Sequence, residues 1–135
     1  MQMQKHSFRN RQSRFCHRSG TAIVEFAVVA PLIFLLFLGG LELTALNFAR
    51  QTAGNASYEA ARKMIIPGGT AAQAQSEGLR QMNIVGLGSG ATVTVTSTTT
   101  SVTATVSVPA SSVSWGLMRF SAGYTLKQTC TLTKE

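Results

Sequence analysis

A long, predominantly apolar stretch, TAIVEFAVVAPLIFLLFLGGL, covers residues 21–41 and sets the strongest limit on the fold. Its only charged residue is Glu25, and its length matches the roughly 20 residues that a helix needs to cross a bilayer. A secretory signal commonly has a shorter apolar run. Pro31 cannot donate a hydrogen bond to the carbonyl of Ala27, so a kink is expected there. The stretch predicts one membrane-spanning helix that stays with the protein.

Residues 1–20, ahead of this stretch, are polar and basic. They contain no acidic residue, and no stable structure is expected for them. Their basic residues are Lys5, Arg9, Arg11, Arg14 and Arg18. The positive-inside rule places such a segment in the cytoplasm. The formal charge of the whole chain is +7, but residues 21–135 hold only seven basic residues against five acidic ones. The excess positive charge therefore lies mostly in residues 1–20, where the positive-inside rule explains it, and no nucleic-acid partner is expected.

The composition argues against catalysis. The sequence has no Asp, and its only histidines, His6 and His17, both precede the apolar stretch. A Ser-His-acid relay needs an imidazole beside the nucleophile, and a zinc site usually needs several His or Cys ligands. We expect no enzyme activity, no catalytic residue, no metal and no cofactor. Cys16 and Cys130 flank the predicted span and so cannot pair within one chain, which leaves Cys130 as a buried core residue or as a site of intermolecular pairing.

The helical pattern continues beyond the span, and a helix over residues 21–66 is expected to end at the sequence PGG of residues 67–69. One side of the extension carries a stripe of small residues that would let another backbone approach closely. The stripe consists of Ala49, Ala53, Ala56 and Ala60. After it, residues 70–73 fit a capping box, which predicts a second helix over residues 71–82.

Alternating Val and Thr residues over 91–108 predict two paired strands with a turn within 97–101, and residues 124–132 predict a third strand with Cys130 facing inward. An apolar cluster over 113–120 is expected either to join the core or to form a partner-binding patch. The fold class is therefore α+β, with a small antiparallel three-stranded sheet. Because its core is thin, we expect the sheet to pack on the long helix, on neighbouring subunits or on both.

Residues 19–26, SGTAIVEF, place a glycine after the basic segment and a glutamate five residues after the glycine. In this the chain resembles prepilins. The resemblance implies that an inner-membrane prepilin peptidase cuts between Gly20 and Thr21, and that Glu25 of one subunit faces the new terminal ammonium of a neighbour. An isolated carboxylate in the bilayer costs roughly 2.5–3.5 kcal/mol, so Glu25 needs such a partner. The alternative is that Glu25 lies near the interface and reaches the headgroups.

The resemblance narrows to the TadE-like pseudopilins of tight-adherence (Tad) pili. It is carried by Glu25-Phe26, the proline-broken span and the segments ARQ at 49–51 and EAAR at 59–62. Thr21 departs from the Phe with which type II secretion pseudopilins generally begin. The resemblance implies a minor pilin that supports adherence and biofilm formation. Its implied partners are prepilin peptidase, a TadF-like pseudopilin, a major Flp-like pilin and the pilus assembly platform.

The predicted organisation has three parts. Residues 1–20 form a cytoplasmic leader that is removed, residues 21–66 form the membrane helix with its extracytoplasmic extension, and residues 67–135 form a small extracytoplasmic α+β domain. The protein is expected in the bacterial inner membrane, with this domain on the periplasmic or extracellular side, or in the pilus. The competing hypothesis is an uncleaved single-pass anchor that presents an adhesive or sensory domain. An amino terminus at Thr21 would separate the two.

Overall fold

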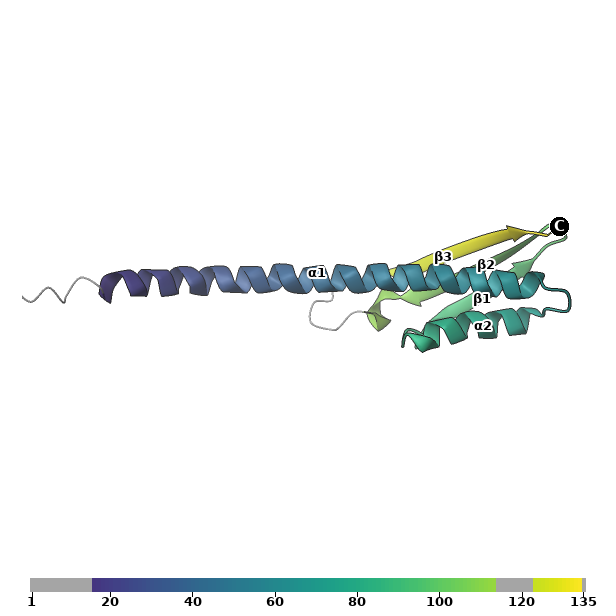
Figure 1. The fold of residues 1–135 in the computed structure, drawn as a ribbon, viewed down its shortest axis with the longest axis horizontal. Helices are drawn as coiled ribbons and strands as arrows, with labels where there is room; N and C mark the ends of the chain where they lie inside the picture. The colour runs from purple at the N-terminus through teal and green to yellow at the C-terminus, as the bar shows by residue number, and fades with distance from the viewer. Residues whose placement is uncertain (1–15, 114–122, 135) are drawn as a thin grey trace, which may run out of the picture. The chain divides into compact units, whose positions relative to one another are not determined.

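The structure is a computed structural model that describes residues 16–113 and 123–134, with side chains described from Gly20 onward. It divides into two compact units, residues 1–37 and residues 38–135. The described elements are a long helix, a short helix and a three-stranded antiparallel sheet, which confirms the predicted α+β class (Figure 1).

The long helix α1 spans Cys16–Ile65 and includes Pro31 in its interior. It begins five residues before Thr21, so the expectation that residues 1–20 lack stable structure is wrong for residues 16–20. Nothing in CHRSG breaks a helix, and each residue added to an existing helix gains one backbone hydrogen bond. The other end is close to the predicted one, because Pro67 follows and Gly68 adopts a left-handed φ of 84°.

Helix α2 spans Ala71–Ile84 and begins with the predicted capping box. The backbone N–H of Gln73 donates to the Thr70 hydroxyl at 3.3 Å, and the backbone N–H of Thr70 donates to the Gln73 side chain at 3.4 Å. The helix runs two residues past the predicted end at Met82. It ends before Gly86, whose φ of 75° turns the chain away from the helix.

The sheet is formed by β1 (Thr92–Ser97), β2 (Ser101–Pro109) and β3 (Thr125–Thr133), with β2 in the centre. The β1–β2 turn falls within the predicted residues, and the Thr98 N–H donates to the Ser101 carbonyl at 2.8 Å. A short 3-10 helix, η1 (Ala110–Ser112), follows β2. Of the predicted apolar cluster, Val113 is buried in the core, and residues 115–120 lie outside the described residues.

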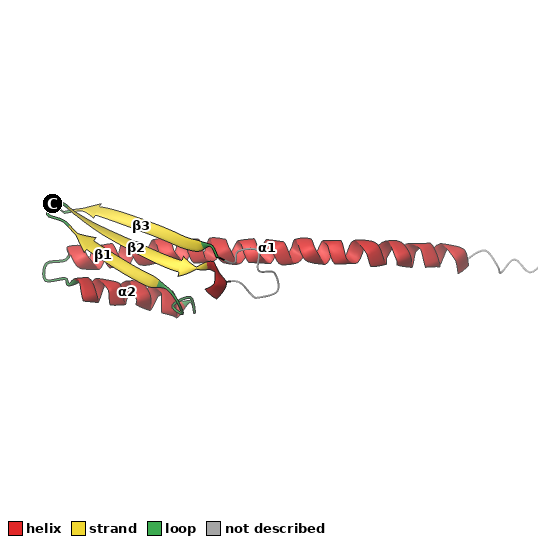
Figure 2. Ribbon diagram, turned by 180° about the vertical axis from the view of Figure 1, so that it is seen from behind, coloured by secondary structure: helices red, strands yellow, loops and turns green. Residues whose placement is uncertain are grey.

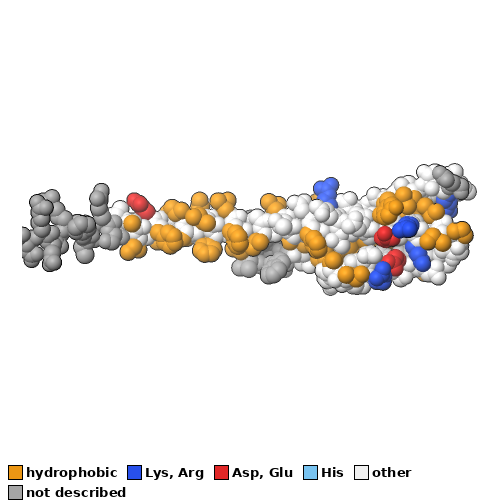
Figure 3. All heavy atoms as spheres, in the orientation of Figure 1, with side chains coloured by type: hydrophobic (Ala, Val, Ile, Leu, Met, Phe, Trp, Pro, Cys, Tyr) orange, Lys and Arg blue, Asp and Glu red, His pale blue; other side chains and the backbone are white. Residues whose placement is uncertain are grey.

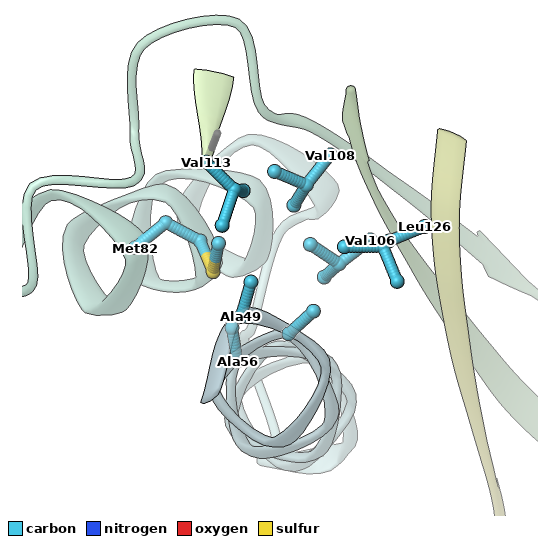
Figure 4. Packing of buried hydrophobic residues seen from close by; sticks show 8 residues of the cluster. Ala49, Ala56, Met82, Val106, Val108, Val113 and Leu126 are labelled. Atoms are coloured by element: carbon cyan, nitrogen blue, oxygen red, sulfur yellow. The ribbon is translucent and has the colours of Figure 1, made fainter. Parts of the chain in front are cut away.

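Both helices pack on one face of the sheet (Figure 2). On this face the central strand presents fully buried side chains, which meet the alanines of α1 and Met82 of α2 (Figure 4). The buried residues of β2 are Val102, Ala104, Val106 and Val108. Their alternation with half-buried Ser and Thr reproduces the period of two that predicted the strand.

Cys130 on β3 is only half-buried, so its predicted place as a buried core residue is wrong. It faces the same side of the sheet as Leu126, which is 6% exposed, but further along the strand Gln128 and Leu132 are also half-buried. The physical reason is that β3 is an edge strand, which has a neighbour on one side only. Residues on its inner face therefore receive less cover than those of the central strand.

Candidate functional site: the amino-terminal helix

The predicted processing site, Gly20-Thr21, lies within the helical backbone of α1. Both residues are exposed, and no atom lies within 4 Å of the position that a Cβ on Gly20 would take. The described residues therefore leave space around Gly20, but a peptidase needs an extended backbone in its cleft. Cleavage at this bond would require the first turns of α1 to unwind, and a glycine lowers the cost of doing so.

Glu25 and Phe26 are both exposed on α1, and Phe26 is 72% exposed. They are adjacent in sequence, so they point in directions about 100° apart around the helix. Thr21 and Glu25 are four residues apart and thus occupy the same face, one turn from each other. A new amino terminus at Thr21 would place an ammonium and a carboxylate on one face of the helix, separated by about 6 Å along the axis.

Large apolar side chains cover the segment that follows Glu25 on all sides. Within residues 23–37 every Val, Ile, Leu and Phe is exposed by 50% or more (Figure 3). In the described part of the chain, α1 is the helix that is long and apolar enough to cross a membrane. In water such a surface would be unfavourable, whereas lipid acyl chains match it. The amino-terminal part of α1 therefore has the length and the apolar surface of a membrane anchor.

The alanine stripe occupies a different place from the anchor. Ala49, Ala53, Ala56 and Ala60 are all 0% exposed and belong to the unit of residues 38–135. The first three contact the cluster around Val106 and Val108, and Ala60 contacts the cluster around Val102. The close approach that small residues permit is thus made by the sheet and by α2 of the same chain.

Gly78 is a packing residue that the sequence analysis missed. It is buried on α2, and a Cβ added there would lie 3.1 Å from a methyl group of Val93 and 3.3 Å from Cβ of Ala60. α2 therefore touches both β1 and α1 at this point, and hydrogen is the only side chain that fits without movement. The one signal in the sequence was a glycine in the middle of a helix, where it costs about 1 kcal/mol relative to alanine unless packing requires it.

Charged residues gather near the turn that joins α1 to α2. An open depression there is lined by Glu59, Arg62, Lys63, Ile66 and Glu77. Arg80 pairs with Glu77 at 2.6 Å. The hydrogen bond that Arg80 donates to the Glu77 carboxylate is the main cause that lowers the pKa of Glu77. The same hydrogen bond raises the pKa of Arg80. The mixed signs favour neither an anion nor a cation as ligand. Over the described ranges, no three His, Cys, Asp or Glu side chains lie together as metal ligands would.

These features define the class of the protein: a small α+β domain carried on a membrane-anchoring helix. Residues 20–62 match the model of the TadE-like protein family, which confirms the resemblance over the anchor and the alanine stripe. The match begins at the glycine of the predicted processing site and ends with the EAAR segment. No curated protein and no solved structure matches the chain.

Proposed function

We propose that the chain is a pseudopilin, or minor pilin, that prepilin peptidase processes between Gly20 and Thr21, and that it serves as a structural or assembly subunit of a Tad-type pilus. The single observation that carries this proposal is the TadE-like match, because it covers the glycine, Glu25-Phe26 and the apolar span together. The proposed role is structural and not enzymatic, and it supports adherence to surfaces.

Charge gives the processing step a physical purpose. Residues 1–20 carry five basic side chains, which would hold the helix end among the cytoplasmic headgroups. Their removal frees that end and creates an ammonium group at Thr21. The terminal ammonium of a neighbouring copy then partners Glu25 in lipid and fixes the axial register between the copies.

The proposed partners are those that the resemblance to the pseudopilins of Tad systems implies. Prepilin peptidase acts at Gly20-Thr21, and other subunits meet the anchor: a TadF-like pseudopilin, a major Flp-like pilin and the assembly platform. The protein resides in the bacterial inner membrane with residues 67–135 on the periplasmic or extracellular side, and it enters the pilus or supports its assembly from the membrane.

Amino-terminal sequencing and intact mass of the protein purified from its native membrane test the proposal. Cells that contain the peptidase should yield a chain that begins at Thr21, and cells that lack it should yield the full-length chain. Gly20→Val should block cleavage without disturbing the fold, because the space around Gly20 is open. Gly39→Val is the matched control, since Gly39 is also unobstructed and lies away from the bond. A full-length chain in cells with active peptidase would refute the proposed processing.

The second candidate is an uncleaved single-pass anchor that presents the folded unit as an adhesive or sensory domain. The observation in its favour is the start of α1 at Cys16, which makes residues 16–20 and the span one continuous helix. Under this hypothesis the amino terminus is the same with and without the peptidase.

A further inference from the structure

One end of the unit of residues 38–135 is where the chain arrives from the membrane span. Ala45 and Leu46 are among the first α1 residues to pack on the core. The core cluster that they contact includes Met82 of α2, Val113 after η1 and Leu126 of β3. α2 ends here, η1 lies here and β3 begins here, at the end of the sheet opposite the β1–β2 turn (Figure 1). Covalent connection makes this the membrane-proximal end of the unit.

This end exposes apolar side chains that the core does not use. Ile84 is 66% exposed and Val85 is 37% exposed at the end of α2, and Tyr124 is 61% exposed just before β3. We call these three residues, which belong to separate segments of this end, the membrane-proximal patch. They are anchored to the core: Ile84 follows buried Met82 by two residues, and the Tyr124 carbonyl accepts a hydrogen bond from the N–H of buried Ala110 at 2.9 Å.

Outside α1, the described segments that form this end carry no charged side chain. Residues 84–91, 108–113 and 123–126 contain no Asp, Glu, Lys or Arg, and the charged residues of α1 nearest to this end are Glu42 and Arg50. At the opposite end the depression around Glu59, Lys63 and Glu77 is rich in charge. Outside α1, the described charged residues are thus more frequent near the α1–α2 turn than at the end where the chain arrives from the span.

The depth of this end matches the lipid interface. If the span ends at Leu41, Ala45 lies about 6 Å farther along the helix at 1.5 Å per residue. The bilayer measures about 30 Å without and about 40–45 Å with its headgroups, so each headgroup layer is about 5–8 Å deep. Leu41 and Leu43, just before Ala45, are themselves more than half exposed and continue the apolar surface of the span.

We propose that the membrane-proximal patch inserts into the headgroup layer of the leaflet from which α1 emerges. Tyr124 suits this layer because its ring is apolar and its hydroxyl is polar, and Ile84 and Val85 add aliphatic area without charge. The contact restrains the domain against the bilayer surface. It depends on α1 being a membrane anchor and not on processing or on pilus assembly.

The test measures where each residue lies in the full-length protein reconstituted into vesicles of phosphatidylethanolamine and phosphatidylglycerol. Spin labels are attached to Ile84→Cys or Tyr124→Cys in a background of Cys16→Ser and Cys130→Ser. Collisions with oxygen, which enters lipid, are compared with collisions with a water-soluble nickel chelate. Thr99→Cys in the exposed β1–β2 turn is the aqueous control, and Leu36→Cys in the span is the lipid control.

The labels at residues 84 and 124 should show an oxygen-to-nickel ratio several-fold above that of the label at 99 and below that of the label at 36. A ratio equal to that at 99 would overturn the proposal. So would a nickel protection that disappears when the protein is diluted with lipid, because a neighbouring copy would then be the cover. Circular dichroism of each variant confirms that the fold is retained, which is expected since the parent side chains are exposed.

Discussion

At the scale of single residues, Glu77 is the titrating group that the structure places most clearly. Its carboxylate is hydrogen-bonded by Arg80, which lowers its pKa below the ordinary value of 4.5. A lowered pKa means that the folded state favours the charged carboxylate. The stabilising contribution is therefore fully present above pH 4.5 and is lost as the pH falls through the lowered pKa of the folded state.

Arg80→Gln should raise the pKa of Glu77 toward 4.5, because it removes the cation and its charged hydrogen bond. NMR titration of the Glu77 side-chain carboxyl measures this pKa. Arg62→Gln is the control, since Arg62 lines the same depression but is not among the groups that lower the pKa of Glu77. An unchanged pKa in Arg80→Gln would show that the ion pair does not form in solution.

A functional or packing residue could be recognised from the sequence only where its neighbours along the chain mark it. Gly20 and Glu25 stand out because a charge step and an apolar run surround them in the sequence. The role of Gly78 depends on Val93 and Ala60, which lie 15 and 18 residues away along the chain and meet it only in the folded state. Tertiary contacts of this kind leave no mark at neighbouring positions.

At the scale of elements, the contact of α2 with β1 and α1 should be sensitive to size. Gly78→Leu should lower the free energy of unfolding by about 1–3 kcal/mol, because its side chain must displace Val93 and Ala60. Thermal unfolding followed by circular dichroism in detergent measures the change. Gly54→Leu on α1 is the matched control, since no atom lies within 4 Å of its Cβ position, and it should leave the stability nearly unchanged. Equal effects of the two variants would argue against the close approach of α2.

The elements themselves were largely predictable. The alternation of Val and Thr located β1 and β2 to within one or two residues, and the alternation of larger side chains with Thr and Lys over 124–132 did the same for β3. The capping box fixed the start of α2 at Ala71. The start of α1 was not predictable, because neither a proline nor a capping residue marks it. Helices extend at low cost where nothing stops them. Cys130 was misjudged because alternation identifies the inward face of a strand but not whether that strand lies at an edge.

At the scale of the whole molecule, the sequence left open whether the sheet packs on its own helix or on neighbouring subunits. The structure shows the first arrangement, since the alanine stripe is fully covered within the chain. Contacts between copies must therefore use other surfaces. The proposed contact through Glu25 lies in the anchor and remains compatible with this packing.

Glu25→Gln should prevent assembly while membrane insertion and cleavage continue. The substitution keeps the shape of the side chain but removes the charge that the neighbouring ammonium would meet, and insertion becomes easier by up to the roughly 2.5–3.5 kcal/mol that an isolated carboxylate costs. Co-purification of differently tagged copies, together with surface pilus counts, measures assembly. Glu59→Gln, on the same helix beyond the span, should assemble normally. Normal assembly of Glu25→Gln would favour the uncleaved anchor.

The methyl groups of the four buried alanines set the distance between helix and sheet, since no atom extends beyond Cβ at these positions. Substitution of these alanines by glycine would remove only one methyl group at each position. The contact is damaged by addition alone, because a larger side chain must push the two layers apart. Natural variation in this domain should therefore be confined here to Gly, Ala and Ser, while the exposed face of the same helix accepts side chains of any size.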